Sequence, residues 1–268
     1  MSSKNKNNTI RANSPKEHLE RLNIAVKLEN ITVEFNGRPT LLNINLEIPS
    51  GSLMAVLGPN NAGKTTLLKT IIGLNKPVSG HVYIFSRHTH ALKNDIAYVP
   101  ERNSVNWQFP TSLYDLAFMG SYNRINFLNR ASKKDKIVTL EALERLKLEK
   151  FADKRISELT RGEKHRALIA RALVQDARII VMDEPMISAD DESIEIIIDV
   201  INELHRKQKT VIVAHHDTMT IPKYFQTAAF INKKLIASGN TSDIFTQQNF
   251  NAAYGVKSSI INNFNSNW

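Results

Sequence analysis

The sequence predicts an α/β protein with a mainly parallel sheet, and two features carry that prediction. Past residue 177, strand-like and helix-like runs alternate at close spacing, which is typical of parallel strands joined by covering helices. Earlier in the chain, the uninterrupted apolar run at residues 53–57 leads directly into a helix-like stretch. A run that is apolar at every position fits a strand buried on both faces in the middle of a parallel sheet.

Two other strand-like runs, residues 25–35 and 41–48, precede this central strand. Apolar and polar side chains alternate in both runs, and the Asn36-Gly37 pair between them is a strong signal for a tight turn. We therefore expect an N-terminal antiparallel sheet at the edge of the fold. Near the other end, residues 228–239 are expected to form a single strand.

The middle of the chain has a helical pattern. Ser112 stands three residues before Asp115, and Ser132 three residues before Asp135. Both pairs are helix N-terminal capping signatures. We therefore expect a helical insertion within one α/β domain. The predicted division is a flexible tail at 1–22, one domain at 23–256 with its core at 23–100 and 175–256 and its helical insertion at about 101–174, and a flexible C-terminus at 257–268.

The composition excludes several classes of protein. The chain has 268 residues and no cysteine, which excludes disulfide scaffolds, thiolate zinc sites, iron–sulfur clusters and thiol catalysis. No apolar stretch approaches the roughly 20 residues that span a bilayer, and the N-terminus does not resemble a secretory signal, so we expect a cytosolic protein. The net charge of +9 favours an anionic partner, without distinguishing nucleotides from nucleic acid or anionic lipid.

A phosphate-binding loop follows the central strand. The segment that fits G-x-x-x-x-G-K-[ST] is Gly58-Pro59-Asn60-Asn61-Ala62-Gly63-Lys64-Thr65, and Thr66 comes next. Backbone N–H groups of such a loop converge on phosphate oxygens at the start of a helix. We expect Lys64 to reach the β- and γ-phosphates of ATP and the Thr65 hydroxyl to bind Mg²⁺. Asn61 stands where glycine is easiest, but asparagine tolerates left-handed backbone angles.

A second candidate site lies at the end of another apolar strand, where Asp183 is followed by Glu184. Taken alone, two carboxylates here fit a charged turn. Beside a phosphate loop, Asp183 is expected to hold Mg²⁺ and Glu184 to act as the general base toward water.

Together these motifs resemble the nucleotide-binding subunit of an ABC transporter over about residues 25–239. The resemblance implies a P-loop NTPase cassette with an N-terminal antiparallel β subdomain and an inserted helical subdomain. It implies that His216, just before Asp217, is the switch histidine that contacts the γ-phosphate, with His215 a bystander. Phe35 is placed either to stack on adenine or to pack in the core as a strand-end aromatic.

The segment from Tyr98 to Pro110 is similar to the equivalent loop in importers of zinc, manganese or iron. Trp107 and Phe109 belong to this similarity, although they also fit simple packing residues under a loop. The family has glutamine where this chain has Glu101. The resemblance therefore implies that Glu101 contacts Mg²⁺ and the attacking water. A carboxylate remains a hard oxygen ligand, but brings negative charge toward the γ-phosphate.

The signature segment also departs from the family, which usually has L-S-G-G-Q. Here Thr160, Arg161, Gly162 and Glu163 follow leucine. The Thr160/Glu163 pair still forms a capping box. Arg161 adds bulk where the family approaches the γ-phosphate of ATP held by the opposite subunit, but its positive charge attracts phosphate, while Glu163 adds negative charge there. These effects oppose each other, and our hypothesis is that ATP binding is intact and dimer-dependent hydrolysis is slower. Asp190 is expected either at the dimer contact or simply as a helix N-cap.

The resemblance implies an ATPase on the cytoplasmic face of the cell membrane that drives import of manganese, zinc or iron. Its expected partners are ATP with Mg²⁺, a second cassette (a copy or a paralogue), a multi-span permease and a separate metal-binding protein, with no nucleic acid. Two alternatives remain open. One is a subunit with weak hydrolysis that pairs with a second cassette or serves as a non-hydrolysing subunit. The other is a soluble ATP switch that is not linked to transport.

Overall fold

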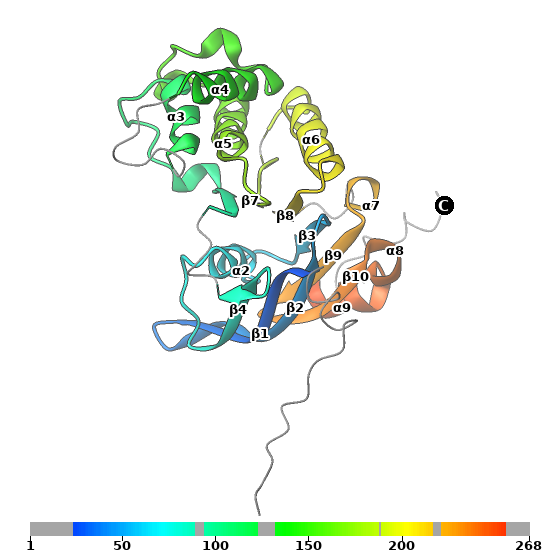
Figure 1. Ribbon diagram of the computed structural model, residues 1–268. Helices are drawn as coiled ribbons and strands as arrows, with labels where there is room; N and C mark the ends of the chain where they lie inside the picture. The colour runs from blue at the N-terminus through cyan, green and yellow to red at the C-terminus, as the bar shows by residue number, and fades with distance from the viewer. Residues whose placement is uncertain (1–23, 89–93, 123–131, 188, 217–220, 256–268) are drawn as a thin grey trace, which may run out of the picture.

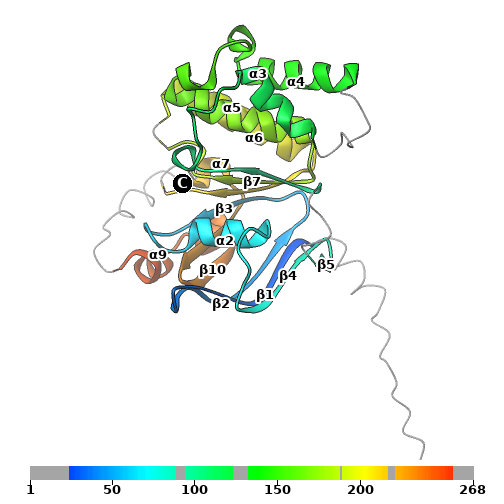
Figure 2. The same cartoon turned by 90° about the vertical axis from the view of Figure 1, so that its left-hand side faces the viewer.

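The computed structural model describes residues 24–88, 94–122, 132–187, 189–216 and 221–255. In this part of the chain the elements form layers around a six-stranded sheet (Figures 1 and 2). Helices α3 to α6 cover one face, and helix α2 with a second, antiparallel sheet covers the other. None of the described helices has the length and apolar character that crossing a membrane requires. The predicted tails and Asp217 lie outside the described residues.

The antiparallel sheet has the strand order β2-β1-β4-β5. Its strands are β1 (Ile24–Phe35), β2 (Arg38–Pro49), β4 (Ser79–Ile84) and β5 (Arg87–His88). Strands β1 and β2 pair as a hairpin, and Phe35 lies opposite Arg38. The turn residues Asn36 and Gly37 have φ angles of 52° and 71°, the left-handed values that tight hairpin turns require. The predicted N-terminal antiparallel sheet is thus confirmed.

The core sheet has the order β10-β9-β3-β8-β7-β6. Its strands are β3 (Leu53–Leu57), β6 (Ile96–Val99), β7 (Ile179–Asp183), β8 (Thr210–Ala214), β9 (Thr227–Asn232) and β10 (Lys234–Asn240). All pairings are parallel except that of β10 with β9. Every residue of β3, β7 and β8 is buried, which explains their continuous apolar runs. The mainly parallel sheet is confirmed.

One expected strand is wrong. Residues 228–239 form two antiparallel strands, because the chain reverses at Lys233, whose φ is 57°. Neither glycine nor proline marks this turn, and Asn232 is the one turn-favouring residue beside it. The reversal brings the turn beside the phosphate loop, where the Lys233 backbone N–H donates to the Ala62 carbonyl at 2.8 Å.

Helices occupy most of the chain between β6 and β7. The described ones are α3 (Leu113–Phe118), η3 (Met119–Ser121), α4 (Lys133–Arg145), η4 (Glu149–Phe151), η5 (Ile156–Glu158) and α5 (Arg161–Gln175), preceded by η2 (Arg102–Ser104). Ser112 caps α3 by accepting the Asp115 N–H at 3.0 Å. Ser132 and Asp135 form a reciprocal capping box on α4. Both capping predictions are confirmed.

Two apolar clusters lie on opposite faces of the core sheet. One joins β1 and β2 to α2 (Lys64–Ile71), and the other joins α3, α4, α5 and α6 (Asp191–Arg206) to the sheet. Alternate residues of one strand face different clusters, so that Ala55 packs toward α5 and α6 while Val56 packs toward α2. The phosphate loop therefore connects two rigid, buried elements.

The short helices after β8 were missing from the predicted pattern. They are α7 (Ile221–Tyr224), α8 (Thr241–Ile244) and α9 (Gln247–Tyr254). The first two have a single turn, and α9 has only two turns with polar residues at half of its positions, so none presents a long apolar period. Helix α9 is held by tertiary contacts instead. Phe250 is buried against Phe230 of β9, with ring centroids 5.1 Å apart.

Candidate functional site

The phosphate loop connects β3 to α2, and its backbone conformation explains its residues. Gly63 is the N-cap of α2 with φ 98°. A Cβ atom at this position would lie 2.7 Å from the Leu41 side chain and 3.0 Å from the Thr40 carbonyl, so both space and φ require glycine. Asn61 has φ 64°, the left-handed conformation that asparagine was expected to tolerate.

Lys64 is buried at the base of this loop. Its Nζ donates to the carbonyls of Gly58 at 2.8 Å and Pro59 at 3.3 Å, and lies 3.6 Å from Glu184 Oε1. The ammonium is therefore held within reach of anything bound on the loop. A cavity of about 720 Å³ opens there, lined by Arg38, Pro39, Thr40, Asn60, Asn61, Ala62, Gly63, Lys64, Thr65, Thr66, Glu101, Glu184, Ile187 and Lys233.

Thr65 and Asp183 come together across 118 residues of sequence. The Thr65 hydroxyl donates to Asp183 Oδ1 at 3.1 Å, and the Tyr98 hydroxyl donates to Asp183 Oδ2 at 3.3 Å. Burial raises the pKa of Asp183, although its hydrogen bond from Thr65 opposes this. A hydroxyl and a buried carboxylate side by side are hard oxygen donors, so these two residues fit a Mg²⁺ ion.

Glu184 stands at the edge of this cavity in a left-handed conformation, with φ 50°. Its backbone N–H donates to the Ala214 carbonyl at 3.1 Å, which ties it to the end of β8. Its Oε2 lies 2.8 Å from His216 Nδ1. The structure thus brings together the predicted base and the predicted switch histidine, in a hydrogen bond that orients the carboxylate beside Lys64.

Glu101 also lines the cavity, from the chain after β6. Its Oε1 accepts a hydrogen bond from Asn103 Nδ2 at 3.2 Å, and its backbone carbonyl accepts one from the Ser104 hydroxyl at 2.7 Å. Its negative charge contributes to the raised pKa of Asp183. Glu101 is thus one of three carboxylates, with Asp183 and Glu184, around the phosphate loop.

Two cations of the cavity were missing from the predicted site. Arg38 lies at the start of β2 and Lys233 at the β9–β10 turn. Lys233 is exposed to solvent and lies beside the phosphate loop. Its backbone N–H bonds Ala62, and its carbonyl accepts from Leu42 N–H at 2.7 Å. No local motif could have shown this, because the contacts join segments that are far apart in the sequence.

Phe35 ends β1 opposite Arg38, and half of its surface is exposed. An aromatic ring at this exposure is not part of the core, so the core-packing alternative is wrong. Phe35 itself does not line the phosphate cavity, but its register partner Arg38 does, so the end of β1 lies next to a cavity-lining residue. The exposed face of the Phe35 ring can stack against a flat, apolar ring attached to phosphates bound in the cavity.

The signature segment opens helix α5. Thr160 Oγ1 accepts the Glu163 N–H at 3.3 Å, and Glu163 Oε2 accepts the Thr160 N–H at 2.7 Å, so the predicted capping box is confirmed. The Glu163 carboxylate is buried and lies 3.9 Å from Lys154 Nζ. Its charge is thus directed back into its own subdomain. Arg161, in contrast, is exposed.

Gly162 is packed against the start of α6. A Cβ atom there would lie 2.3 Å from Ser193 Oγ and 2.6 Å from Asp190 Oδ2, so a larger residue would displace the side chains that cap α6. Asp190 caps α6 by accepting the Ser193 N–H at 2.8 Å, and this hydrogen bond lowers the pKa of Asp190. The capping role expected of Asp190 is confirmed, while its dimer contact stays a prediction.

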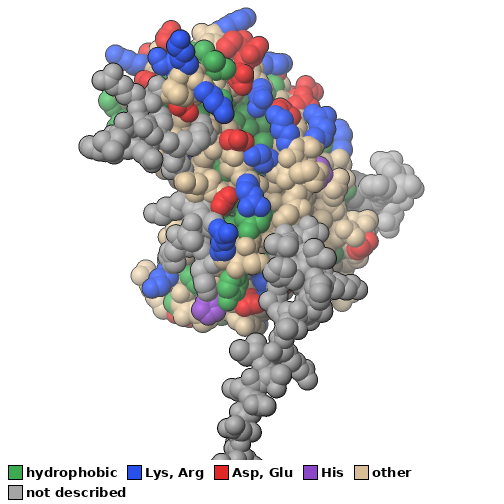
Figure 3. Space-filling view, viewed as in Figure 1, with side chains coloured by type: hydrophobic (Ala, Val, Ile, Leu, Met, Phe, Trp, Pro, Cys, Tyr) green, Lys and Arg blue, Asp and Glu red, His purple; other side chains and the backbone are tan. Residues whose placement is uncertain are grey.

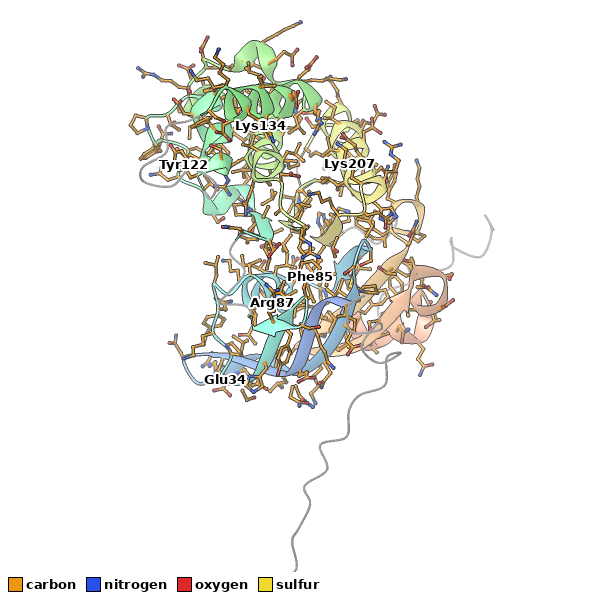
Figure 4. The ribbon with its side chains drawn as sticks, viewed as in Figure 1. Glu34, Phe85, Arg87, Tyr122, Lys134 and Lys207 are labelled. Atoms are coloured by element: carbon orange, nitrogen blue, oxygen red, sulfur yellow. The ribbon has the colours of Figure 1, made fainter. Side chains whose placement is uncertain are left out.

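The two aromatic residues of the loop after β6 differ. Trp107 Nε1 donates to the Arg102 carbonyl at 2.9 Å, and its ring lies 5.4 Å from Lys164 Nζ, so it packs against the loop as expected. Phe109 is 55% exposed, so the packing alternative is wrong for it. Tyr122, at the outer edge of the helical part in Figure 4, is 58% exposed. The segment between β6 and α4 thus exposes two aromatic rings, those of Phe109 and Tyr122.

Figure 3 shows Lys and Arg side chains spread over the face in view, with Asp and Glu among them. They do not gather into one basic groove on that face. The cations that are positioned to contact a bound anion are those that line the phosphate cavity. These features define a nucleotide-binding protein of the P-loop class.

The profile of the ABC transporter family matches residues 41–187. TroB of Treponema pallidum (strain Nichols), a zinc transport system ATP-binding protein, is 38% identical over 231 residues, 86% of this chain and 87% of that protein. MntB of Bacillus subtilis (strain 168), a manganese transport system ATP-binding protein, is 40% identical over 230 residues, 86% of this chain and 92% of that protein. The chain therefore belongs to the ABC transporter family, as one of its ATP-binding cassettes.

Solved structures agree with this membership. A chain of a metal-chelate type ABC transporter in an inward-facing conformation superposes with a TM-score of 0.75 at 26% identity, covering 86% of this chain and 88% of that one. A dimeric ATP-binding cassette in a post-hydrolysis state with ADP and Pi gives 0.71 at 27% identity, covering 80% and 98%. The predicted resemblance, fold class and ATPase activity are confirmed.

Proposed function

We propose that this chain hydrolyses ATP to energise import of a divalent metal ion, with manganese or zinc as the cargo. The observation that carries the hydrolytic part is the 2.8 Å contact between Glu184 and His216, next to Lys64 on the phosphate loop. The cargo rests on relatives named for zinc and manganese transport. Their names give no support to a soluble switch or a non-hydrolysing subunit.

In the proposed reaction the loop N–H groups and Lys64 hold the β- and γ-phosphates of ATP. Lys64 then exchanges its contacts with loop carbonyls for contacts with phosphate oxygens. Glu184 accepts the proton of the attacking water, and His216 holds Glu184 in place and contacts the γ-phosphate. Phe35 stacks on adenine, and Arg38 and Lys233 add positive charge at the phosphates.

Thr65 and Asp183 would hold Mg²⁺, and Glu101 lies on the same side of the cavity. The ion, when bound, neutralises phosphate charge and organises the γ-phosphate for attack. The raised pKa of Asp183 shows that burial of its charge is unfavourable before a cation arrives. Glu101 stands where the family has an amide. Its carboxylate adds a third negative charge, beside those of Asp183 and Glu184, that bound Mg²⁺ would help to neutralise.

The proposed assembly contains two cassettes, each supplying a phosphate loop to one ATP and a signature segment (Thr160, Arg161, Gly162 and Glu163) to the other. Asp190 lies beside Gly162 and would contribute to this contact. A multi-span permease would dock from the membrane near residues 101–120, where Phe109 is exposed, so that the cassette is peripheral on the cytoplasmic face. A separate metal-binding protein would deliver the ion.

Co-expression of this chain with a multi-span permease of a metal transport system from the same organism tests the proposal. We expect a membrane complex that hydrolyses ATP and accumulates labelled Mn²⁺ or Zn²⁺ in vesicles, and that does neither when the cassette carries Glu184→Gln. Failure to purify with any membrane protein would contradict the transport role. Hydrolysis without accumulation of either metal would contradict the proposed cargo.

A further inference from the structure

A cluster of three metal-ligating side chains lies at the edge of the phosphate cavity. It consists of Glu184, His215 and His216, whose ligand atoms all lie within 4.8 Å of one another. Glu184 Oε2 is 2.8 Å from His216 Nδ1 and 3.9 Å from His215 Nδ1. The proposed hydrolysis uses Glu184 and His216 but assigns nothing to His215, which is 4% exposed.

We propose that Glu184, His215 and His216 form an inhibitory binding site for a transition-metal ion, with Zn²⁺ as the ion of best fit. Zn²⁺ binds imidazole nitrogen and carboxylate oxygen at about 2.0–2.2 Å in tetrahedral geometry, which separates neighbouring donor atoms by about 3.3 Å. The two distances from Glu184 Oε2, 2.8 and 3.9 Å, lie on either side of that separation. With all three ligand atoms within 4.8 Å of one another, side-chain rotations without backbone movement would bring the three donors around one ion.

The backbone holds these residues in place. Glu184 follows β7 and the two histidines follow β8, which pair in parallel and lie side by side (Figure 1). The Glu184 N–H donates to the Ala214 carbonyl, and the His215 N–H donates to the Val56 carbonyl of β3, each at 3.1 Å. Three neighbouring strands thus fix the cluster, so little ordering is required when an ion binds.

The donor set distinguishes this site from the Mg²⁺ position. Two imidazoles and one carboxylate are the set that zinc enzymes use when a fourth position is open to solvent or substrate. Mg²⁺ prefers oxygen ligands and near-octahedral geometry, which Thr65 and Asp183 serve instead. The His216 side chain is 47% exposed, so the cluster is open to solvent on one side and the ion has a path of entry.

An ion at this site would stop hydrolysis and leave ATP binding intact. It would occupy the Glu184 oxygen that accepts the proton from water, and it would hold the His216 ring away from the γ-phosphate. Lys64, Thr65 and the loop N–H groups remain available to ATP. If the proposed function is correct, accumulation of the imported metal in the cytoplasm would inhibit its own import. Only this effect on import rests on the proposed function; metal binding and inhibition of hydrolysis do not.

Direct binding of Zn²⁺ to the full-length chain tests the site without reference to transport. Calorimetry with Zn²⁺ alone should show one site that weakens at least tenfold in His215→Asn and in His216→Ala. Substitution by Co²⁺ should give the intense visible absorption of a tetrahedral nitrogen and oxygen site. His81→Asn, which removes an exposed histidine on β4, is the control and should bind like the original chain. Equal Zn²⁺ affinity in all four proteins would overturn the proposal.

Inhibition is measured as phosphate release at saturating Mg²⁺ and ATP, with free Zn²⁺ set by a chelator buffer so that ATP does not remove it. We expect Zn²⁺ to inhibit the original chain and His81→Asn alike. His215→Asn should need at least tenfold more Zn²⁺ for half-inhibition, with its zinc-free rate unchanged. Bound Zn²⁺ that leaves hydrolysis unaffected would refute the inhibitory role. Failure to transport metal would leave both measurements valid.

Discussion

The phosphate-loop side of the cassette and its signature side use their charged residues in different ways. On the first, Lys64, Asp183 and Glu184 are buried around a cavity, and their contacts with one another leave them directed toward a ligand. On the second, Glu163 is buried too, but it faces backward into the capping box of its own helix. One side is arranged for chemistry, and the other for supporting a helix end.

This difference changes the interpretation of the departures from the family signature. Glu163 had been expected to bring negative charge toward the partner's phosphate, but its carboxylate bonds Thr160 N–H and faces Lys154. Arg161, in contrast, is exposed to solvent. Of the two departures, Arg161 is therefore the one positioned to affect a partner.

The largest expected effect comes from removing the cation of the phosphate-loop side. Lys64→Ala should abolish hydrolysis and weaken ATP binding about 100-fold, because a charge-assisted contact to phosphate is worth about 1.5–3 kcal/mol. Titration with a fluorescent ATP analogue and phosphate release measure the two effects. Arg161→Ala, on the signature side, should leave ATP binding to the single chain unaltered. An equal loss of ATP affinity in both variants would contradict the difference between the two sides.

Acid should destabilise the signature side through His165 of α5. Burial, with Arg102 as a smaller cause, lowers the pKa of this histidine to about 4. Because a histidine in an unfolded chain has a pKa of about 6.5, the unfolded chain takes up this proton first as pH falls. The contribution to stability is therefore present above pH 6.5 and is lost toward pH 4, by about 3 kcal/mol.

Urea unfolding of the original chain and of His165→Gln at several pH values measures this loss. The difference between their free energies of unfolding should change steadily in favour of the variant as pH falls from 6.5 to 4. A difference that stays constant over this interval would show that His165 is protonated equally in both states.

A smaller effect is expected at Lys233, the cation that the β9–β10 turn brings to the phosphate cavity. Lys233→Ala should raise the KM for ATP several-fold, about 1 kcal/mol, since it removes one partly solvated charge near the phosphates. Lys234→Ala, the adjacent residue of the basic pair, is the matched control, because it does not line the cavity. Equal KM values in the two variants would place Lys233 outside the site.

The smallest change is expected from restoring the family signature. In the assembled transporter Arg161→Gly should raise turnover about two- to threefold, whereas Glu163→Gln should change it less, because the amide still accepts a hydrogen bond from Thr160. Thermal unfolding checks that neither variant disturbs α5. A larger increase for Glu163→Gln than for Arg161→Gly would mean that the Glu163 carboxylate does reach the partner's phosphate.

Much of this architecture follows from local chemistry in the sequence. The alternation of β1 and β2, the apolar run of β3 and the caps at Ser112 and Ser132 each depend on neighbouring residues, and each was predicted. So was the pairing of Thr65 with Asp183, because the phosphate loop and the acidic strand end each have a recognisable motif.

What the sequence did not reveal depends on contacts between distant segments. The reversal at Lys233 is marked only by Asn232, without glycine or proline, and its place beside Ala62 follows from strand order. The direction of Glu163 and the exposure of Phe35 and Phe109 are likewise set by packing. Residue type alone predicts what such side chains can do, but not which way they face.

The central claim is that the phosphate-loop side of this cassette hydrolyses ATP with Glu184 as the general base. Phosphate release by the original assembly and by the Glu184→Gln assembly, with ATP affinity measured on both, tests it most directly. We predict equal ATP affinity and a loss of at least 100-fold in turnover for the variant. Undiminished turnover in Glu184→Gln would contradict the account.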